Sequence, residues 1–286
     1  LFTAFLSASQ DIVIDAYRPA LLPNEQRGLG AAFFVFGYRV ALLVAGAFAL
    51  ILSEYLGWNV TFFIMGSLLI LGALGTLFGP EPTVAVKPPK SMRDALWGPL
   101  KDFFHRSGAI SIIFFIILYK LGDAYAGALT TTFLIRGVGV SVADVGIINK
   151  GMGLVATIGG ALFGGALMIK LGLYRSLMIF GILQMVSNLS FMVLGLAGKS
   201  YPILIGAIGF ENITGGMGTS AFVALLMSLC NPAFSATQFA LLSSLAALGR
   251  VVISPTSGFL VEMVGWPLFF LFSTVISPIL PPLYGV

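Results

Sequence analysis

The chain has 286 residues, of which 58% are hydrophobic and only 9% are charged, and its formal net charge is +4. Soluble domains carry about 25% charged residues, so this chain cannot cover a water-soluble fold and must lie in a lipid bilayer. The positive charge does not indicate nucleic-acid binding, because the Lys and Arg residues flank apolar runs instead of forming one patch. With one cysteine and one histidine, the sequence has no disulfide framework and no His/Cys cluster, so we expect no metal and no cofactor.

The apolar runs predict nine membrane-spanning helices, since a span needs about 20 mostly apolar residues. In chain order the predicted spans cover residues 1–22, 28–53, 59–78, 108–134, 142–169, 175–197, 202–229, 236–262 and 266–284. Glycine and proline separate them, as at Pro23, Gly172 and Pro232. The chain starts at Leu1 inside an apolar run, with no charged leader region, so we expect it to begin within a helix.

The polar stretch at residues 80–107 sets the predicted orientation. It carries five basic residues, and the positive-inside rule therefore places it in the cytoplasm. With spans alternating from there, nine Lys and Arg residues fall in cytoplasmic joins, and only Arg136 and Lys199 fall in joins on the opposite side. Ser91 and Asp94 resemble the cap of a short helix with one apolar side, which we expect to lie on the inner leaflet as a linker.

Two five-residue motifs, which we call the corners, repeat each other in the sequence. Glu54-Tyr-Leu-Gly57-Trp58 matches Glu262-Met-Val-Gly265-Trp266 at an offset of 208 residues (262 minus 54). Six predicted spans separate the copies, and this even number gives both copies the same orientation. The pattern describes two parallel six-helix repeats, which is the arrangement of major facilitator transporters.

The predicted fold is therefore an all-α membrane protein with a major facilitator fold. The second repeat shows six helices and the first shows three, so we expect the first three helices of the N-terminal half to be absent from this chain. The predicted parts are a partial N-terminal half at 1–79, a cytoplasmic linker with an interfacial helix at 80–107, and a C-terminal six-helix half at 108–286. We expect a multi-pass monomer embedded in the bilayer.

Ionisable residues inside the predicted spans are the candidates for function, because each one costs about 2.5 to 3.5 kcal/mol on insertion scales. Four are acidic and four are basic, and this balance favours pairing across a central cavity. They are Asp11, Asp15, Asp123, Glu211, Arg39, Lys120, Lys150 and Arg250.

Asp11 and Asp15 lie four residues apart and so share a helix face, with Gln10 beside them as a candidate substrate ligand. Two carboxylates that face a low-dielectric cavity can share a proton, which suits a reversible proton carrier. The alternative is structural, with Asp15 paired to Arg18 or to Arg39. The other candidates for proton coupling are Asp123 and Glu211.

Arg39 and Arg250 precede the two repeated corners at comparable positions. Arginine keeps its charge and grips carboxylates with a bidentate fork, so this pair is the candidate clamp for an anionic substrate, with Lys150 as a third member. The alternative is that these residues brace neighbouring helices. Lys120 is a further substrate candidate, and without ligand we expect it to pair with Asp123, three residues along the helix.

Small and hydroxyl residues follow Glu211 in mid-membrane, in the run Asn212-Ile-Thr-Gly-Gly-Met-Gly218-Thr219-Ser220. Here the helix could unwind and line a cavity, with Asn212 as a substrate ligand, or a neighbouring helix could approach closely. Gly160 and Gly164 form a small-xxx-small pattern, which favours close helix packing.

Two other classes of function fit less well. The sequence contains none of the HExxH, GxSxG and GxxxxGK[ST] motifs, so we expect no enzyme. A channel predicts a ring of like residues or an oligomeric filter. A two-fold repeat with opposite charges favours alternating access instead.

Several polar stretches resemble those of one family. They include Ser9-Gln10-Asp11-Ile-Val-Ile-Asp15-Ala-Tyr-Arg18, Leu118-Tyr-Lys120-Leu-Gly-Asp123-Ala124, Phe210-Glu211-Asn212 and Phe234-Ser-Ala-Thr-Gln-Phe-Ala-Leu-Leu242. Through these residues the chain resembles the AmpG-type muropeptide permeases from about Ser9 to Phe272. Chance similarity between apolar helices would not reproduce these polar residues in order.

The resemblance implies an importer in the bacterial inner membrane, which moves anhydromuropeptides built on N-acetylglucosamine and anhydro-N-acetylmuramic acid into the cytoplasm. It further implies coupling to the proton motive force, a role in peptidoglycan recycling and an indirect link to β-lactamase induction. The carboxylates of a muropeptide stem suit Arg39, Arg250 or Lys150. A transporter of another bulky anion, such as an acyl-CoA, is the alternative.

Overall fold

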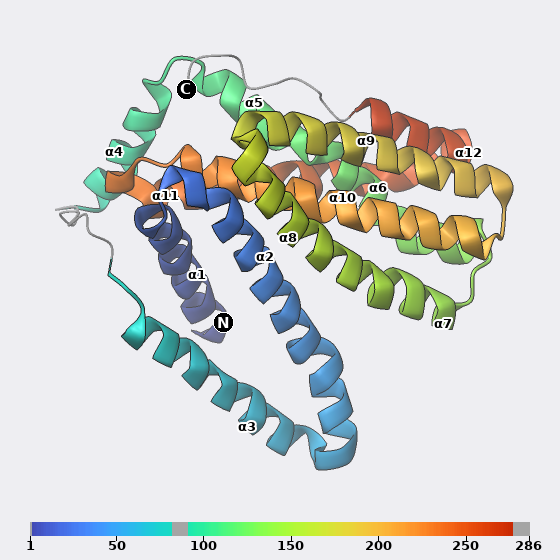
Figure 1. The fold of residues 1–286 in the computed structure, drawn as a ribbon, viewed down its shortest axis with the longest axis horizontal. Coiled ribbons are helices and arrows are strands. Elements are labelled where there is room, and N and C mark those ends of the chain that lie inside the picture. Colours follow the sequence, from blue (N-terminus) through green and yellow to red (C-terminus); the bar gives the residue numbers. More distant parts are fainter. Residues whose placement is uncertain (1, 82–90, 277–286) are drawn as a thin grey trace.

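The computed structural model describes residues 2–81 and 91–276, and within these ranges it is helical with no β-strand. A first group consists of α1 (Phe2–Leu21), α2 (Arg27–Leu43) and α3 (Ala49–Phe78), and α4 (Met92–Phe104) follows it (Figure 1). The second group consists of α5 (Ala109–Tyr119), α6 (Leu121–Thr132), α7 (Val142–Asp144), α8 (Gly153–Leu171), α9 (Leu173–Ala197), α10 (Tyr201–Ser228), α11 (Ser235–Leu248) and α12 (Ser257–Val275). Short 3-10 or π segments join several of them: η1 (Asn24–Gln26), η2 (Val44–Phe48), η3 (Phe133–Gly137), η4 (Val145–Met152), η5 (Pro232–Phe234), η6 (Gly249–Ile253) and η7 (Ser254–Thr256).

Six helical stretches among the described residues are long and apolar enough to cross a membrane: Arg27–Gly46, Ile51–Phe78, Ala109–Gly137, Val142–Leu171, Leu173–Ala197 and Ser235–Val275. The last of these contains the eighth predicted span and the first part of the ninth, and α1 and α10 cover two more. The all-α membrane fold is therefore confirmed. Residues 82–90 of the predicted linker and the end of the ninth predicted span lie outside the described residues.

The predicted repeat is present in the structure. Helices α2 and α11 begin at Arg27 and Ser235, which are 208 residues apart (235 minus 27), and a three-residue 3-10 turn precedes each. The corner glycines also match, since Gly57 has φ 75° and ψ 163° and Gly265 has φ 75° and ψ 170°. A positive φ of this kind is accessible to glycine and strongly disfavoured for other residues. The conformation explains why both copies of the motif carry glycine at this point.

Two details inside the spans differ from expectation. The predicted span at 108–134 is interrupted at Lys120, whose φ of −99° and ψ of 3° separate α5 from α6. Conversely, α10 is a continuous helix from Tyr201 to Ser228. The possibility that the chain unwinds after Glu211 is therefore wrong.

Helices α8 and α10 pack with their backbones in contact, which is what the glycines allow. A Cβ on Gly216 would overlap the carbonyl oxygen of Thr157, and one on Gly160 would overlap that of Ile213. A Cβ on Gly164 would meet the α10 backbone at 2.8 Å. Small residues permit such close approach in membranes, so the predicted close packing is confirmed.

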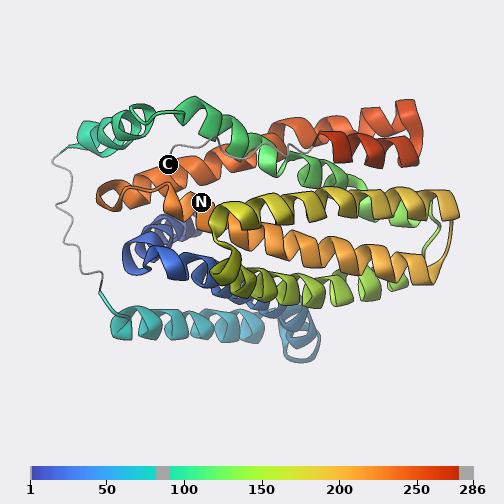
Figure 2. The same ribbon diagram turned by 45° about the horizontal axis from the view of Figure 1, so that its top comes forward.

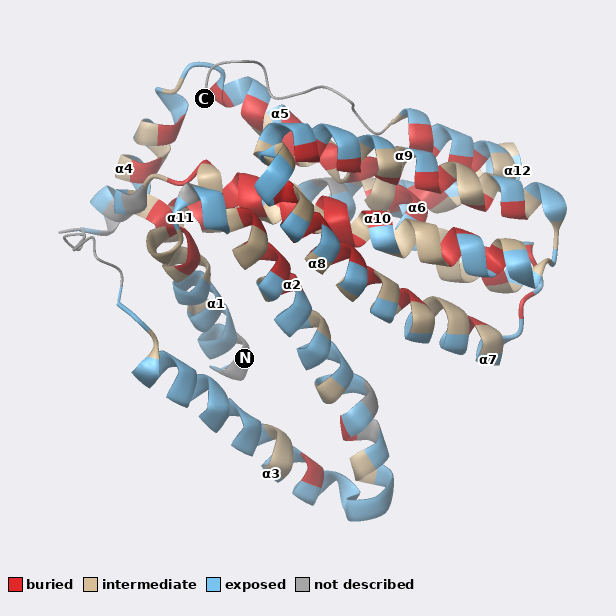
Figure 3. Ribbon diagram, viewed as in Figure 1, coloured by how far each residue is buried: buried red, intermediate tan, exposed pale blue. Residues whose placement is uncertain are grey.

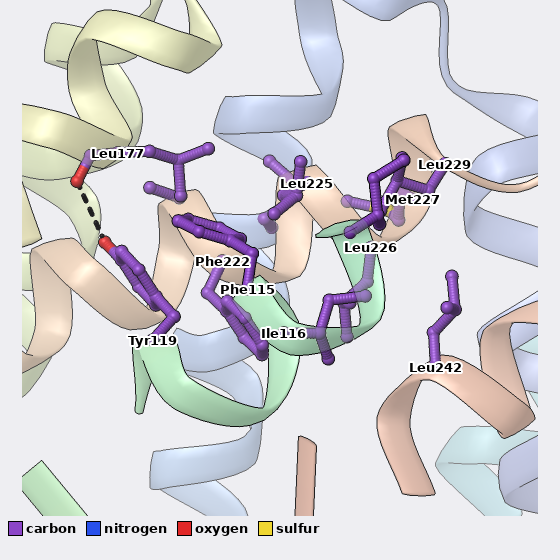
Figure 4. Close-up of a cluster of buried hydrophobic side chains, with 14 of the residues drawn as sticks. Phe115, Ile116, Tyr119, Leu177, Phe222, Leu225, Leu226, Met227, Leu229 and Leu242 are labelled. Atoms are coloured by element: carbon purple, nitrogen blue, oxygen red, sulfur yellow. Dashed lines mark hydrogen bonds between the residues drawn. The ribbon is translucent and has the colours of Figure 1, made fainter. Parts of the chain in front are cut away.

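Buried apolar side chains of the second group form two clusters. In the first, around α5 and α10, the ring of Tyr119 stacks on Phe222 with 5.3 Å between centroids, and its hydroxyl donates to the Leu177 carbonyl oxygen at 3.1 Å (Figure 4). The second joins α6, α9 and α12 around Phe133 and Phe270, whose ring centroids are 4.7 Å apart. Burial is concentrated in this group, whereas α3 is mostly exposed (Figure 3).

The two groups meet along a contact that we call the seam, formed by α1 and α2 against α8, α10 and α11. The seam is closest at the end of the molecule where α4 lies, and α2 diverges from α8 and α10 toward the other end (Figure 1). Figure 2 shows α3 outermost, with α1 and α2 between it and the second group. At the α4 end Gly28 faces Met168, and Ala32 faces Gly165. The two groups are therefore closest to one another at the α4 end.

Candidate functional site

A polar centre, formed by Lys120, Asp123, Gln184 and Thr219, lies between α6, α9 and α10. The Lys120 Nζ is 3.4 Å from Asp123 Oδ2, and it donates at 3.2 Å both to Gln184 Oε1 and to Thr219 Oγ1. Gln184 Nε2 in turn donates to the Asp123 carboxylate. The Lys120 and Asp123 side chains are only 20% and 21% exposed. The predicted Lys120–Asp123 ion pair is thus present, and its hydrogen bonds with Gln184 of α9 and Thr219 of α10 hold it in place.

Gly218 makes room for this centre. A Cβ at that position would lie 2.5 Å from Gln184 Oε1 and 3.6 Å from Lys120 Nζ. The break in the helix at Lys120 also frees that residue from the regular α-helical backbone. In the glycine run of α10, Gly216 therefore allows close packing against α8, and Gly218 leaves space for the side chains of the polar centre.

Glu211 of α10 links the polar centre to the first group of helices. The charges of Asp123, Lys120, Arg39 and Lys150 all act on its carboxyl group. Arg39 belongs to α2 and Lys150 to η4. The half-buried Glu211 carboxylate has no hydrogen bond or ion pair within residues 2–81 and 91–276. One other predicted acid, Asp123, and three predicted bases, Lys120, Arg39 and Lys150, thus act electrostatically on the carboxyl group of Glu211.

Arg39 is half-buried on α2, and its Nε atom is buried with no hydrogen-bond partner among the described residues. A desolvated guanidinium with free donors is suited to a carboxylate, because charge-assisted bonds of this type are strong. Arg250 lies in η6 and Lys150 in η4, and both side chains are exposed. The two arginines of the predicted clamp therefore have different surroundings.

The acids of α1 also differ from one another. Asp11 and its neighbour Gln10 are exposed. Asp15 is 23% exposed and forms an ion pair with Arg18 on the same helix. The structure therefore contains the predicted alternative in which Asp15 pairs with Arg18. Asp11 is the exposed carboxylate of the two.

Asn212 joins two helices. Its Oδ1 accepts a hydrogen bond from Thr157 Oγ1 of α8 at 2.9 Å, and its Nδ2 donates to the Ile208 carbonyl oxygen at 2.9 Å. Gly153 leaves space for it, since a Cβ there would come within 3.0 Å of Asn212 Nδ2. To bind a substrate through Oδ1, Asn212 would have to give up the bond that now connects α8 to α10.

A second polar network fixes α4 and was not among the predicted candidates. Asp102 accepts hydrogen bonds from Arg106 at 2.6 Å, from Gln238 at 2.7 Å and from Asn231 at 3.0 Å. Burial raises the pKa of Asp102, but the hydrogen bonds from Gln238, Arg106 and Asn231 outweigh it and hold the pKa below its usual value. We call these four residues the α4 anchor. It attaches α4 to the corner between α10 and α11, and the predicted cap of α4 is confirmed, because Ser91 accepts from the Asp94 amide at 3.1 Å.

Gln184 is the residue of the polar centre that sequence reasoning missed. It is 5% exposed and lies inside the predicted span at 175–197. A buried amide in a membrane span needs partners, and this requirement is the signal that could have identified it.

With the fold and the polar centre described, the chain can be compared with known proteins. The profile of the Major Facilitator Superfamily matches residues 1–198. The chain belongs to the Major Facilitator Superfamily and is a multi-pass membrane protein.

Individual members of this superfamily share many identical residues with the chain. The chain is 55% identical over 271 residues to the anhydromuropeptide permease of Escherichia coli strain K12, an alignment that covers 94% of this chain and 55% of that protein. It is 35% identical over 291 residues to the putative transporter AmpG 4 of Rickettsia conorii, covering 99% of this chain and 70% of the relative. It is 38% identical over 285 residues to an uncharacterized protein of Haemophilus influenzae. The resemblance to AmpG-type permeases is confirmed, and the chain spans about half the length of the Escherichia coli relative.

Proposed function

We propose that this chain is part of a secondary transporter of the bacterial inner membrane, which imports anhydromuropeptides from the periplasm to the cytoplasm for peptidoglycan recycling. The observation that carries the proposal is the 55% identity, over 94% of the chain, to an anhydromuropeptide permease. The charges around Glu211 support it, because they come from both groups of helices. In this proposal residues 80–107 lie in the cytoplasm, the proton is the coupling ion and the protein acts as a monomer.

Arg39 is the primary substrate ligand in this proposal. A muropeptide stem carries carboxylates, and the buried Arg39 Nε has no partner among the described residues. A bidentate contact would fix the orientation of the stem as well as its charge. Lys150, Arg250 and Gln10 are secondary ligands in this proposal, since their side chains are polar and exposed.

Glu211 is the primary proton carrier. Asp123 and Asp15 already have cationic partners, in Lys120 and Arg18, whereas the Glu211 carboxylate has none within the described ranges. Without a proton, its negative charge competes with the substrate carboxylate for Arg39. With a proton, the charge of Arg39 is left to the substrate. Proton binding and anion binding therefore favour one another, which is the linkage that symport requires.

The test is uptake of labelled anhydromuropeptide by the full-length protein in proteoliposomes, with and without an imposed proton gradient. We expect uptake that depends on the gradient, and gradient-independent exchange only in a Glu211→Gln variant. No uptake by folded protein would withdraw the muropeptide assignment. Competition by an acyl-CoA but not by an unlabelled muropeptide would favour the alternative substrate.

A further inference from the structure

Arg18, in the last turn of α1, lies at the seam and is only 9% exposed. Its guanidinium carbon is 3.6 Å from the centroid of the Phe34 ring on α2 and 5.1 Å from that of the Phe239 ring on α11. Phe34 belongs to the first group of helices and Phe239 to the second. One buried cation therefore contacts an aromatic ring from each group, and such contacts gain strength when they are desolvated.

The hydrogen bonds of Arg18 are incomplete. Its Nη2 atom bonds to the Asp15 carboxylate, but Nε and Nη1 are buried with no partner among the described residues. A buried donor without a partner costs free energy that water would restore. The ring of Phe239 thus holds Arg18 in the closed seam, while the unpaired donors favour its release into water.

We infer that Arg18 is a gate residue: the α4 end of the seam opens when its guanidinium leaves the ring of Phe239, and Phe239 holds that end closed. Helix α1 packs directly on α11, so the two groups cannot separate at this end without breaking the contact. Asp15 positions the guanidinium from one turn earlier on α1. The inference rests on the proposed alternating access, but not on the identity of the substrate.

Cys230 can report this opening. It is the chain's one cysteine and is 5% exposed, just beyond the end of α10. The residues on either side of it bond to the α4 region, since the Leu229 carbonyl oxygen accepts from Arg106 and Asn231 donates to Asp102. Arg27, which begins α2 of the first group, acts electrostatically on its thiol. Cys230 therefore lies at the α4 end of the seam, where separation of the two groups would expose it to a thiol reagent.

The experiment measures the rate at which a maleimide labels Cys230 in the purified full-length protein, with any cysteine outside residues 1–286 replaced by serine. We expect Phe239→Leu to raise the rate about tenfold, equivalent to about 1.4 kcal/mol. Phe239→Trp should lower it below that of the parent, because Trp is the better ring for a cation. The second variant moves the rate in the opposite direction, so general loosening of the fold cannot produce both results.

Phe34→Leu is the matched control. It removes the nearer ring from the same guanidinium, but that ring belongs to the same group as Arg18. A gate role predicts labelling close to the parent rate, whereas a simple packing role predicts at least as large an increase as for Phe239→Leu. Equal increases in the two leucine variants, or no response to either change at Phe239, would overturn the inference. Because no substrate is present, these outcomes are independent of whether muropeptide is transported.

Discussion

Gln184 of α9 donates a hydrogen bond to the Asp123 carboxylate of α6, and the oxygen of the same amide accepts from Lys120. One neutral side chain therefore contacts both members of a largely buried ion pair. Charges away from water are tolerated when their remaining donors and acceptors are satisfied. The amide thus makes the ion pair compatible with the interior of the bundle.

Gln184→Leu should destabilise the protein. The substitution removes one partner from each charge of the ion pair, which costs about 1 to 3 kcal/mol per unsatisfied group. We expect a lower melting temperature in detergent, measured by intrinsic fluorescence, and reduced uptake. Gln26→Leu is the control, because Gln26 is exposed and its side chain makes no cap hydrogen bond. Parent-like melting of the Gln184 variant would show that the amide does not support the polar centre.

Gly216→Ala should disrupt the contact between α8 and α10. The added Cβ would overlap the Thr157 carbonyl oxygen and lie 2.8 Å from the Ala161 amide nitrogen. Because these atoms are backbone, relief requires a helix shift, and we expect a loss of about 1 to 3 kcal/mol of stability. Gly159 of α8 is the control position, because a Cβ there has nothing within 4 Å. There alanine should leave the melting temperature unchanged or raise it slightly, since alanine is the better helix former.

Arg39→Gln should raise KM for the anionic substrate about tenfold, which corresponds to about 1.4 kcal/mol of lost binding. The variant lacks the charged fork whose Nε is unpartnered in the described structure. Arg39→Lys should give an intermediate KM, because it keeps the charge without the fork. Arg136→Gln, a change at an exposed arginine of η3, should leave KM as it is. If KM for the Arg39 variants also stays at the parent value, Arg39 is a brace and not a ligand.

Asp102→Asn should weaken the α4 anchor in a manner that depends on pH. A carboxyl group whose pKa is lowered by folding stabilises the folded state above its unfolded pKa of about 3.9, and that stabilisation is lost as pH falls through the folded pKa. The variant should therefore melt at a lower temperature than the parent at pH 7, and the difference should shrink as the pH falls below about 4. Thermal melts across this range provide the measurement, with Asp94→Asn at the exposed start of α4 as the control. A difference that is constant with pH would mean that the charge of Asp102 does not contribute.

Sequence patterns predicted the features that depend on local chemistry. The corners at Gly57 and Gly265 are found because the two motifs that contain them repeat each other at an offset of 208 residues, and the positive φ at both glycines explains why glycine occurs in each copy. The pairing of Lys120 with Asp123 was predicted because residues three apart on a helix face one another. The ion pair depends on neighbours in the chain and the repeat on two similar motifs, so one sequence suffices to find both.

The remaining parts of the site depend on residues that are distant in sequence. Gln184 and Thr219 reach Lys120 across separations of 64 and 99 residues, and the partners of Asp102 on the α10–α11 corner lie more than 100 residues away. Arg39 and Arg250 have different surroundings because they do not occupy the same position in the two repeats. The repeat counterpart of Arg39 is Ala247 (39 plus 208), and Arg250 lies beyond it in the π segment η6, where its side chain is exposed.

The corners at Gly57 and Gly265 each join two helices through a single non-helical residue. A longer loop would absorb a change in the tilt of one helix, whereas a one-residue elbow transmits that change to the next helix along the chain. We therefore expect the two helices that meet at each elbow to tilt together. The same geometry leaves a protease, which needs an extended stretch of backbone, without a cleavage site at either elbow.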